Sequence, residues 1–271
     1  FKANKMNIAI TNKSSYIGYK IAFDLAKIGH NAIHIHDNIW TDKNLLSTHM
    51  QHNKIECFIH LRPEIVNIPV EGYNNLLLDM AEDDIKLYNN LTKMGIKFVY
   101  MSTTKINPYS SIKFPDMHAG SKYFAEQYMP KASIVRTNIP IGAYTKRYSK
   151  IGEPSVIRGL LDSIIYDRNL IILNGSTNIY TSVFDISKDI ISAIGAPASL
   201  YTQNKGIIAT NLQLLNMFND ILDVNIRPDI KKINDNSIDY SLDKNIVPYS
   251  KEEIESIIGS YKRMKVIPDD W

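Results

Sequence analysis

The sequence NIAITNKSSYIG, from Asn7 to Gly18, decides the fold of this chain. An apolar run that suits a buried strand ends in a short polar turn, and apolar residues with helical spacing (Ile17, Ile21, Leu25) follow at once. When a strand, a tight turn and a helix open an α/β sheet in this order, the helix N-terminus presents N–H groups to the phosphates of a bound nucleotide. We therefore predict a phosphate-binding turn at the start of the chain.

The turn itself departs from the usual glycine pattern. Asn12 and Ser15 stand at two positions where such turns hold glycine, and only Gly18 remains. Asn tolerates a positive φ better than most residues, so Asn12 can keep the turn, whereas Ser15 adds a side chain where the backbone must approach phosphate. The spacing also fits an ordinary strand-to-helix turn. The candidate cofactor-binding residues of the turn are Thr11, Asn12, Ser15, Tyr16, Ile17 and Gly18.

Outward from the turn, short apolar runs alternate with helical patterns. Repeated strand–helix–strand units form a parallel sheet with helices on both faces. Residues 1–145 are therefore expected to form a Rossmann-like, doubly wound α/β domain that binds a dinucleotide. The expected strands are Met6–Ile10, Asn31–Ile35, Glu56–Leu61, Lys97–Met101 and Ala132–Arg136, and the expected helices are Ile17–Ile28, Asp83–Met94 and Ser121–Tyr128.

The alternation loosens after Gly142. The last predicted helix opens with a capping box, in which Glu253 follows the Ser250 cap by three residues. Residues 146–271 are expected to form a smaller C-terminal substrate lobe, interleaved with the first domain. Its other expected elements are helices at Glu153–Tyr166 and Asp185–Ile194, strands at Leu170–Leu173 and Gly206–Thr210, and a helix that ends at Leu222.

The composition excludes several classes of protein. With 44% hydrophobic and 22% charged residues the chain suits a folded protein, and no run approaches the ~20 apolar residues of a membrane span. A net charge of +3 argues against a nucleic-acid partner. The single cysteine, Cys57, allows no internal disulfide, which suits the cytoplasm. His30, His34 and His36 have no carboxylate in clear register, so no metal is expected.

Motifs along most of the chain, in order and with fitting spacing, resemble those of one enzyme family. Cys57–Leu61 resembles the motif IHLAA, although Arg62 and Pro63 replace its small pair. The other motifs are Gly95–Thr104 (a strand that ends in a catalytic Ser or Thr), Ser121–Glu126 (SK…AE), Val135–Gly142 (RxxNxYG), Ser182–Asp185 (VxD) and Val247–Glu253 (P…SLEEG). Together they make the chain resemble the extended short-chain dehydrogenase/reductase family, which includes nucleotide-sugar epimerases, dehydratases and reductases.

The resemblance implies NAD or NADP as cofactor and a nucleotide sugar as substrate. In the family, an acid at the end of the second strand binds the adenosine ribose. That position falls on His36 here, with Asp37 beside it, so the choice between NAD and NADP stays open. Asn138, in the segment Val135–Gly142, is a candidate substrate-binding residue. Lys146 and Arg147 are candidates for contacts to the substrate diphosphate, or form a solvated loop.

The resemblance also implies an assembly. Family members commonly dimerise through two neighbouring helices, which here are Asp83–Met94 and Ser121–Tyr128, so a homodimer is expected. Leu87, Leu91 and Met94 have the spacing of an apolar helix face, but the same face also suits packing against the sheet.

The family's catalysis implies three groups. A Tyr transfers a proton, a Lys four residues later binds the nicotinamide ribose and lowers the tyrosine pKa, and a Ser or Thr polarises the substrate oxygen. Lys122 occupies the lysine position, Thr103 or Thr104 supplies the hydroxyl, and His118 stands where the family has Tyr. Tyr109–Lys113 also fits the Tyr–Lys spacing, but no A-E helix follows it, so we interpret this match as a coincidence in a loop.

Three functions therefore stay open. The first is a redox enzyme in which His118 carries the proton, since histidine titrates near neutral pH. The second is a non-catalytic protein that keeps the fold as a scaffold or partner-binding subunit. The third is a different chemistry. The altered glycine turn and position 118 are the features that separate them.

Overall fold

The computed structural model describes residues 5–12, 15–62, 70–106, 117–143, 155–166, 170–174, 177–232 and 246–263. The chain divides into two compact units: Phe1–Thr137 with Ser187–Thr202, and Asn138–Ile186 with Gln203–Trp271. The chain thus leaves the first unit at Asn138 and returns to it at Ser187. The sequence-based division after residue 145 stays a proposal about the functional domains.

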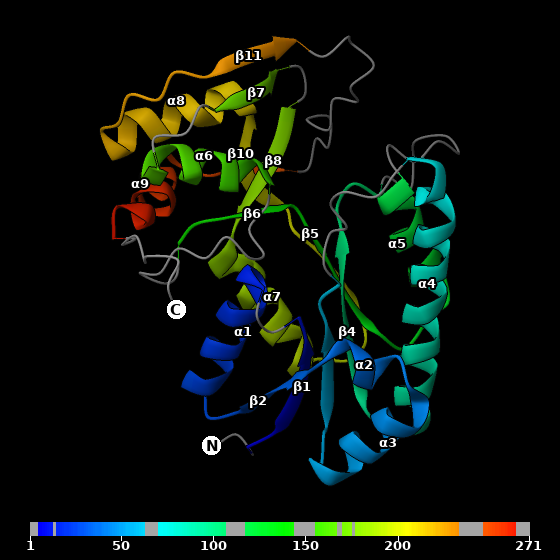
Figure 1. The fold of residues 1–271 in the computed structure, drawn as a ribbon. Coiled ribbons are helices and arrows are strands. Elements are labelled where there is room, and N and C mark those ends of the chain that lie inside the picture. Colours follow the sequence, from blue (N-terminus) through cyan, green and yellow to red (C-terminus); the bar gives the residue numbers. More distant parts are fainter. Residues whose placement is uncertain are drawn as a thin grey trace. The chain divides into compact units, whose positions relative to one another are not determined.

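A parallel sheet forms the centre of the first unit. The elements are β1 (Asn7–Thr11), α1 (Tyr16–Lys27), β2 (Asn31–Ile35), α2 (Asp37–Trp40), α3 (Lys43–His52), β3 (Cys57–His60), α4 (Val70–Lys93), β4 (Lys97–Thr103), α5 (Met117–Gln127), β5 (Ser133–Thr137), the greater part of α7 (Val183–Gly195) and β9 (Leu200–Thr202). The six strands lie in the order β2-β1-β3-β4-β5-β9, and each neighbouring pair is parallel. Figure 1 shows α1 and α7 on one face of the sheet and α3, α4 and α5 on the other.

The burial pattern explains why both faces are covered. Strand β3 is buried along its whole length and β1 from Ile8 to Thr11, as strands between two helical layers must be. On one face, Ile21 and Leu25 of α1 are fully buried. On the other face, Leu87 and Leu91 of α4 belong to the core. The apolar face of α4 therefore covers the sheet, which decides between the two interpretations that the sequence left open.

The segment between β2 and β3 lacks a strand that the usual dinucleotide-binding sheet contains. Residues 36–56, all of them described, form α2 and α3 and contain no strand. Asp42 caps α3, because its carboxylate accepts hydrogen bonds from the N–H groups of Asn44 and Leu45 at 2.8 and 3.0 Å. Strand β2 is consequently an edge of the described sheet.

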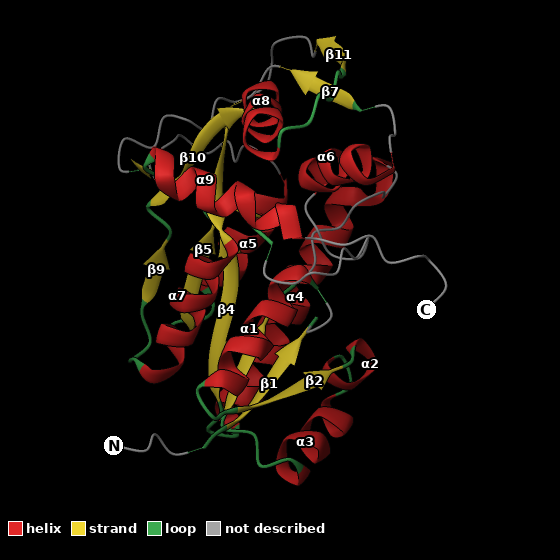
Figure 2. Ribbon diagram, turned by 90° about the vertical axis from the view of Figure 1, so that its left-hand side faces the viewer, coloured by secondary structure: helices red, strands yellow, loops and turns green. Residues whose placement is uncertain are grey.

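The second unit is a mixed α/β structure. Its elements are β6 (Ile139–Ile141), α6 (Ser155–Tyr166), β7 (Ile171–Asn174), β8 (Thr177–Ser182), the start of α7, β10 (Lys205–Thr210), α8 (Asn211–Leu222), β11 (Asp229–Lys232), β12 (Val247–Pro248), α9 (Lys251–Gly259) and a 3-10 turn (Ser260–Arg263). The strands form a β12-β10-β8-β6 sheet and a β11-β7 pair. Helices α6, α8 and α9 share one apolar core with β8 and β10 (Figure 2). The capping box predicted at Ser250 and Glu253 is confirmed.

Among the described residues, no helix combines the length and the apolar composition that crossing a membrane requires.

Candidate functional site

The order of the strands marks where a ligand binds in the first unit. Strand β1 has β2 on one side and β3 on the other, so the direction in which the sheet is built reverses between β1 and β3. In open α/β sheets, ligands bind at such a reversal, at the carboxyl ends of the strands. Thr11 ends β1 and His60 ends β3, and the predicted phosphate turn begins at the same edge.

The described ends of the turn after β1 are Asn12 and Ser15. Asn12 has a φ of 50°, as its predicted role requires. The N–H of Ser15 donates to the carbonyl of Asn12 at 2.9 Å, which closes the turn. The Ser15 hydroxyl caps α1 by accepting from the N–H of Gly18 at 3.1 Å, and no described residue accepts its own hydrogen. The side chain of Tyr16 lies outside the described residues, and Ile17 is buried.

Thr11 is held by a buried relay of hydrogen bonds. Its hydroxyl accepts from the N–H of Leu61 at 2.9 Å and lies 3.0 Å from Nδ1 of His60. Nε2 of His60 lies 2.8 Å from Oδ1 of Asp84. A carboxylate only accepts, so Nε2 carries the proton, and Nδ1 accepts from Thr11. The side chain of Thr11 therefore anchors the turn to β3, and its contribution to binding a ligand is through the backbone.

The relay continues through Asp84. Its other oxygen accepts from the Tyr100 hydroxyl at 2.7 Å, and Nη1 of Arg62 lies 2.6 Å from Oδ1. Burial opposes the charge of Asp84, but His60 and the two nearby cations hold the pKa of this carboxyl below its ordinary value. Burial lowers the pKa of His60, which stays neutral, and raises that of Tyr100 well above its ordinary value. Arg62 also donates to the carbonyl of Met80.

The sequence analysis did not single out Asp84 or Tyr100 and noted Arg62 only as a departure from a motif. A signal for Asp84 was present, because Asp84, Leu87, Tyr88 and Leu91 share the spacing of one helix face. A carboxylate on a buried helix face needs partners, and a search for them would have led to His60.

Lys122 lies against the carboxyl-terminal part of β4. Its ammonium donates to the carbonyl of Met101 at 3.1 Å and lies 4.5 Å from the centroid of the Tyr100 ring. The side chain is almost fully buried. Burial lowers the pKa of Lys122 to about 8, and the nearby Asp84 carboxylate opposes the shift. The backbone of His118 lies one turn earlier in α5, while its side chain lies outside the described residues.

The structure distinguishes the hydroxyls at the end of β4. The hydroxyl of Thr104 donates to the carbonyl of Thr137 at 3.4 Å. The oxygen of Thr103 accepts from the N–H of Lys105 at 3.3 Å, and no acceptor for its own hydrogen is found among the described residues. Ser102, which the sequence analysis did not consider, has a buried hydroxyl for which the described part of the chain provides no partner. Thr103 and Thr104 thus have different hydrogen-bond partners, and both stay candidates for the catalytic hydroxyl.

The end of β2 offers a different set of groups. His36 is exposed, and its ring centroid lies 4.4 Å from that of His34. Asp37 is the first residue of α2, and its side chain lies outside the described residues. No carboxylate is therefore described at the strand end where the ribose-binding acid was expected. Trp40 meets the ring of His60 edge-on at 5.2 Å.

The predicted substrate-binding residues lie in the second unit. Asn138 is buried, and its Nδ2 donates to the Thr181 hydroxyl at 2.9 Å, which in turn donates to the carbonyl of Lys205 at 2.8 Å. Lys146 and Arg147 lie outside the described residues. In the described ranges, no group of three or more His, Cys, Asp or Glu residues could hold a metal ion.

Comparison with known proteins reveals likeness in fold alone. No family model and no curated protein sequence matches the chain. Solved structures do match. The UDP-glucose 4-epimerase of Thermus thermophilus, in complex with NAD, is 14% identical, with a TM-score of 0.72 over 95% of this chain and 99% of that chain.

Two further solved structures have a similar fold. The UDP-glucose 4-epimerase of Thermotoga maritima with UDP-glucose is 17% identical, with a TM-score of 0.69 over 95% of this chain and 99% of that one. The dTDP-4-dehydrorhamnose reductase of Bacillus anthracis, in complex with NADP, is 16% identical, with a TM-score of 0.70 over 85% and 84%. The Rossmann-like fold is thereby confirmed, and so, at the level of fold, is the resemblance to extended short-chain dehydrogenases/reductases.

Proposed function

We propose that the chain is an NAD- or NADP-dependent enzyme that modifies a nucleotide sugar, as an epimerase, dehydratase or reductase. The observation that carries this proposal is the turn from β1 to α1. It combines a positive φ at Asn12 with a Ser15 cap whose hydroxyl hydrogen no described residue accepts, at the reversal point of the sheet. The fold, shared with structures of such enzymes in complex with NAD or NADP, supports it.

The residues present fit the phosphate half of such a cofactor. The N-terminus of α1 attracts the pyrophosphate, since the first N–H groups of a helix have no intrahelical acceptor. Lys122 is held at β4, two strands away from the turn, where its ammonium donates to the carbonyl of Met101, two residues before Thr103. At the adenosine half, His36 is the described side chain at the end of β2, and the side chain of Asp37 lies outside the described residues.

When bound, the nicotinamide cofactor would supply the hydride chemistry of the proposed reaction. The hydroxyl of Thr103 or Thr104 donates its hydrogen to the substrate oxygen. His118 gives a proton to that oxygen or takes one from it, in the place of the family's tyrosine. Lys122 keeps positive charge near the site and orients the cofactor ribose.

A scaffold or partner-binding role is the second candidate function. Two groups of the expected site are bound within the protein: the Thr11 hydroxyl by His60 and Leu61, and the Lys122 ammonium by the carbonyl of Met101. A protein that no longer turns over a substrate can keep both contacts permanently.

Binding of the cofactor tests the proposal first. Titration with NADH and with NADPH, followed by fluorescence, is expected to show a complex with wild type. Ser15→Asp keeps the cap of α1, since Asp caps helices as well as Ser, but places a negative charge where the phosphates bind. This variant should lose binding. Thr210→Asp makes a corresponding change at the cap of α8 and should bind like wild type. Absence of a wild-type complex with either nucleotide would contradict the proposal.

Turnover then separates the two candidate functions. Wild type should oxidise NADH or NADPH with a 4-keto nucleotide sugar, faster as the pH falls and an imidazole takes up its proton. His118→Ala should abolish this turnover, and His118→Tyr should shift the pH profile toward that of tyrosine-dependent enzymes. A chain that binds the cofactor but neither reduces a keto sugar nor epimerises or dehydrates a nucleotide sugar, either as wild type or as His118→Tyr, is the scaffold.

A further inference from the structure

The half of the sheet that should hold the adenosine of a dinucleotide is incomplete. Dinucleotide-binding sheets usually consist of two three-stranded halves in the order 3-2-1-4-5-6, and each half binds one mononucleotide. Here the half that begins with β1 contains only β1 and β2, since residues 36–56 form α2 and α3. The strand that would lie outside β2 is missing from this fully described segment.

The described side chains at the end of β2 include no acid for a ribose, and the side chain of Asp37 lies outside the described residues. In place of an open loop, α2 begins at once, and the N–H of Ile39 donates to the carbonyl of His36 at 2.9 Å. The described side chain at the strand end is the imidazole of His36, paired with that of His34. The ribose hydroxyls of NAD usually meet a carboxylate there.

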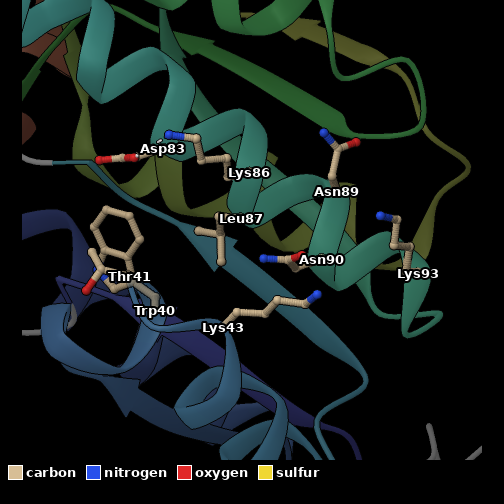
Figure 3. Close-up of a pocket in the computed structure, with 9 residues that line it drawn as sticks. All are labelled: Trp40, Thr41, Lys43, Asp83, Lys86, Leu87, Asn89, Asn90 and Lys93. Carbon is tan, nitrogen blue, oxygen red and sulfur yellow. Dashed lines mark hydrogen bonds and ion pairs between the residues drawn. The ribbon is translucent and has the colours of Figure 1, made fainter.

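Helix α2 changes the neighbouring surface as well. Trp40 packs edge-on against His60, which ends β3. Beside Trp40, an open groove of about 430 Å³ extends between α2–α3 and α4, with Lys43 on one side and Asp83, Lys86 and Lys93 on the other (Figure 3). No further helix of the described chain covers this part of the face. The groove is thus consistent with the loss of a strand and its helix.

The remaining strand order suits a smaller ligand. The order 2-1-3-4-5 is also that of doubly wound proteins that hold a mononucleotide at the reversal between strands 1 and 3. The groups that favour a ligand here, the turn at Asn12 and Ser15 and the Lys122 ammonium, lie on β1, α1 and α5. None of them belongs to β2 or α2.

We propose that this site binds its cofactor through the nicotinamide mononucleotide half, and that the adenosine half adds little affinity. The inference rests on the proposed cofactor binding and specifies which part of the cofactor is recognised. The free energy of binding then comes from the phosphate turn and the nicotinamide side of the sheet.

Calorimetric titration with NADH and with reduced nicotinamide mononucleotide tests the inference. The two dissociation constants are expected to differ by less than about tenfold, and AMP should not displace NADH. NADH binding that is more than about tenfold tighter than the mononucleotide, or displacement by AMP, would overturn the inference while leaving the proposed function intact. If neither reduced nucleotide binds, the proposed function itself is wrong.

Two variants test whether residues at the end of β2 and in α2 bind the adenosine half of the cofactor. His36→Ala should change the dissociation constants of NADH and of the mononucleotide by the same factor, and so should Trp40→Ala. His52→Ala, at an exposed histidine of α3, is the control and should change neither. A loss of affinity for NADH alone in His36→Ala or Trp40→Ala would show that these residues bind the adenosine, and the inference would be wrong.

Discussion

Asp84 connects three parts of the first unit through one buried carboxylate. It accepts hydrogen bonds from His60 at the end of β3 and from Tyr100 in β4, and it pairs with Arg62 after β3. Because Arg62 is itself nearly buried, its charge depends on this partner. The attraction between the two charges therefore contributes little net stability. Removing one of them is costly, because the other charge would stay buried without a partner.

Asp84→Asn should destabilise the protein by roughly 3–5 kcal/mol, since a buried cation loses its counter-charge. Urea unfolding of wild type and variant measures the difference. Asp83→Asn is the matched control on the same helix. Asp83 pairs with Lys86 at 3.5 Å on the surface, so this change should cost less than about 1 kcal/mol. Equal losses in the two variants would show that the buried relay does not stabilise the unit.

The buried ammonium of Lys122 predicts a stability that depends on pH. Its pKa is about 8 in the folded chain against an ordinary value of 10.5, so between these values the unfolded chain binds more protons. The free energy of unfolding must then rise with pH in this range. Wild type should become more stable relative to Lys122→Met as the pH increases from 8 to 10, measured by urea unfolding. A difference that stays constant over this range would contradict the low pKa of Lys122.

Individual residues differ in how readily the sequence reveals their roles. The positive φ of Asn12 could be predicted, because the turn needs it and few residue types tolerate it. The different partners of Thr103 and Thr104 could not, since their hydrogen bonds with Lys105 and Thr137 form only at the folded strand ends.

At the scale of elements, apolar runs predict the strands well. The start of a helix is harder to predict where its first residues have a low helix propensity. Strand Asn31–Ile35 has the predicted bounds, because polar residues, His30 and His36, flank it on both sides. Helix α4 begins at Val70, far ahead of the predicted Asp83. Its first part contains Gly72 and Asn74, which favour helices poorly, so no pattern there indicated a helix.

The turn between β1 and α1 can be tested as a structural unit. Asn12→Val should destabilise the chain by about 1–2 kcal/mol, since a branched side chain is strained at a φ of 50°. Asn12→Gly should change stability by less than about 1 kcal/mol. Asn31→Val, on the extended backbone of β2, is the control and should cost less than about 0.5 kcal/mol. Thermal unfolding checks the order of the variants, and an equal loss in Asn12→Val and Asn31→Val would argue against a strained turn.

For the whole molecule, the alternation of strands and helices predicts a parallel, doubly wound sheet but not its complete order. The strand order depends on contacts between residues far apart in the chain. Strand β9, for example, pairs with β5 only after the chain has passed through part of the second unit. The lack of a strand outside β2 likewise follows from the strand order of the described sheet, and the alternation of strands and helices in the sequence did not predict it.

Assembly is the property of the whole molecule that remains a prediction. The apolar face of α4 with Leu87 and Leu91 covers the sheet, but Leu78 of α4, Phe124 of α5 and Tyr128 directly after α5 are exposed. We expect a homodimer through these helices, because burying large apolar side chains favours association. Light scattering of wild type should give a mass of twice 30.9 kDa at high concentration.

Charge on this surface should separate the subunits. Phe124→Glu combined with Tyr128→Glu is expected to give only the 30.9 kDa species, because two carboxylates cannot be buried without partners. Tyr19→Glu combined with Phe23→Glu is the control. These aromatic residues have the same spacing and are 53% and 52% exposed, but they belong to α1 on the opposite face of the sheet (Figure 1). This control should still dimerise. Monomeric wild type at every concentration would exclude the dimer, and dissociation by the α1 control alone would move the interface to the opposite face of the sheet.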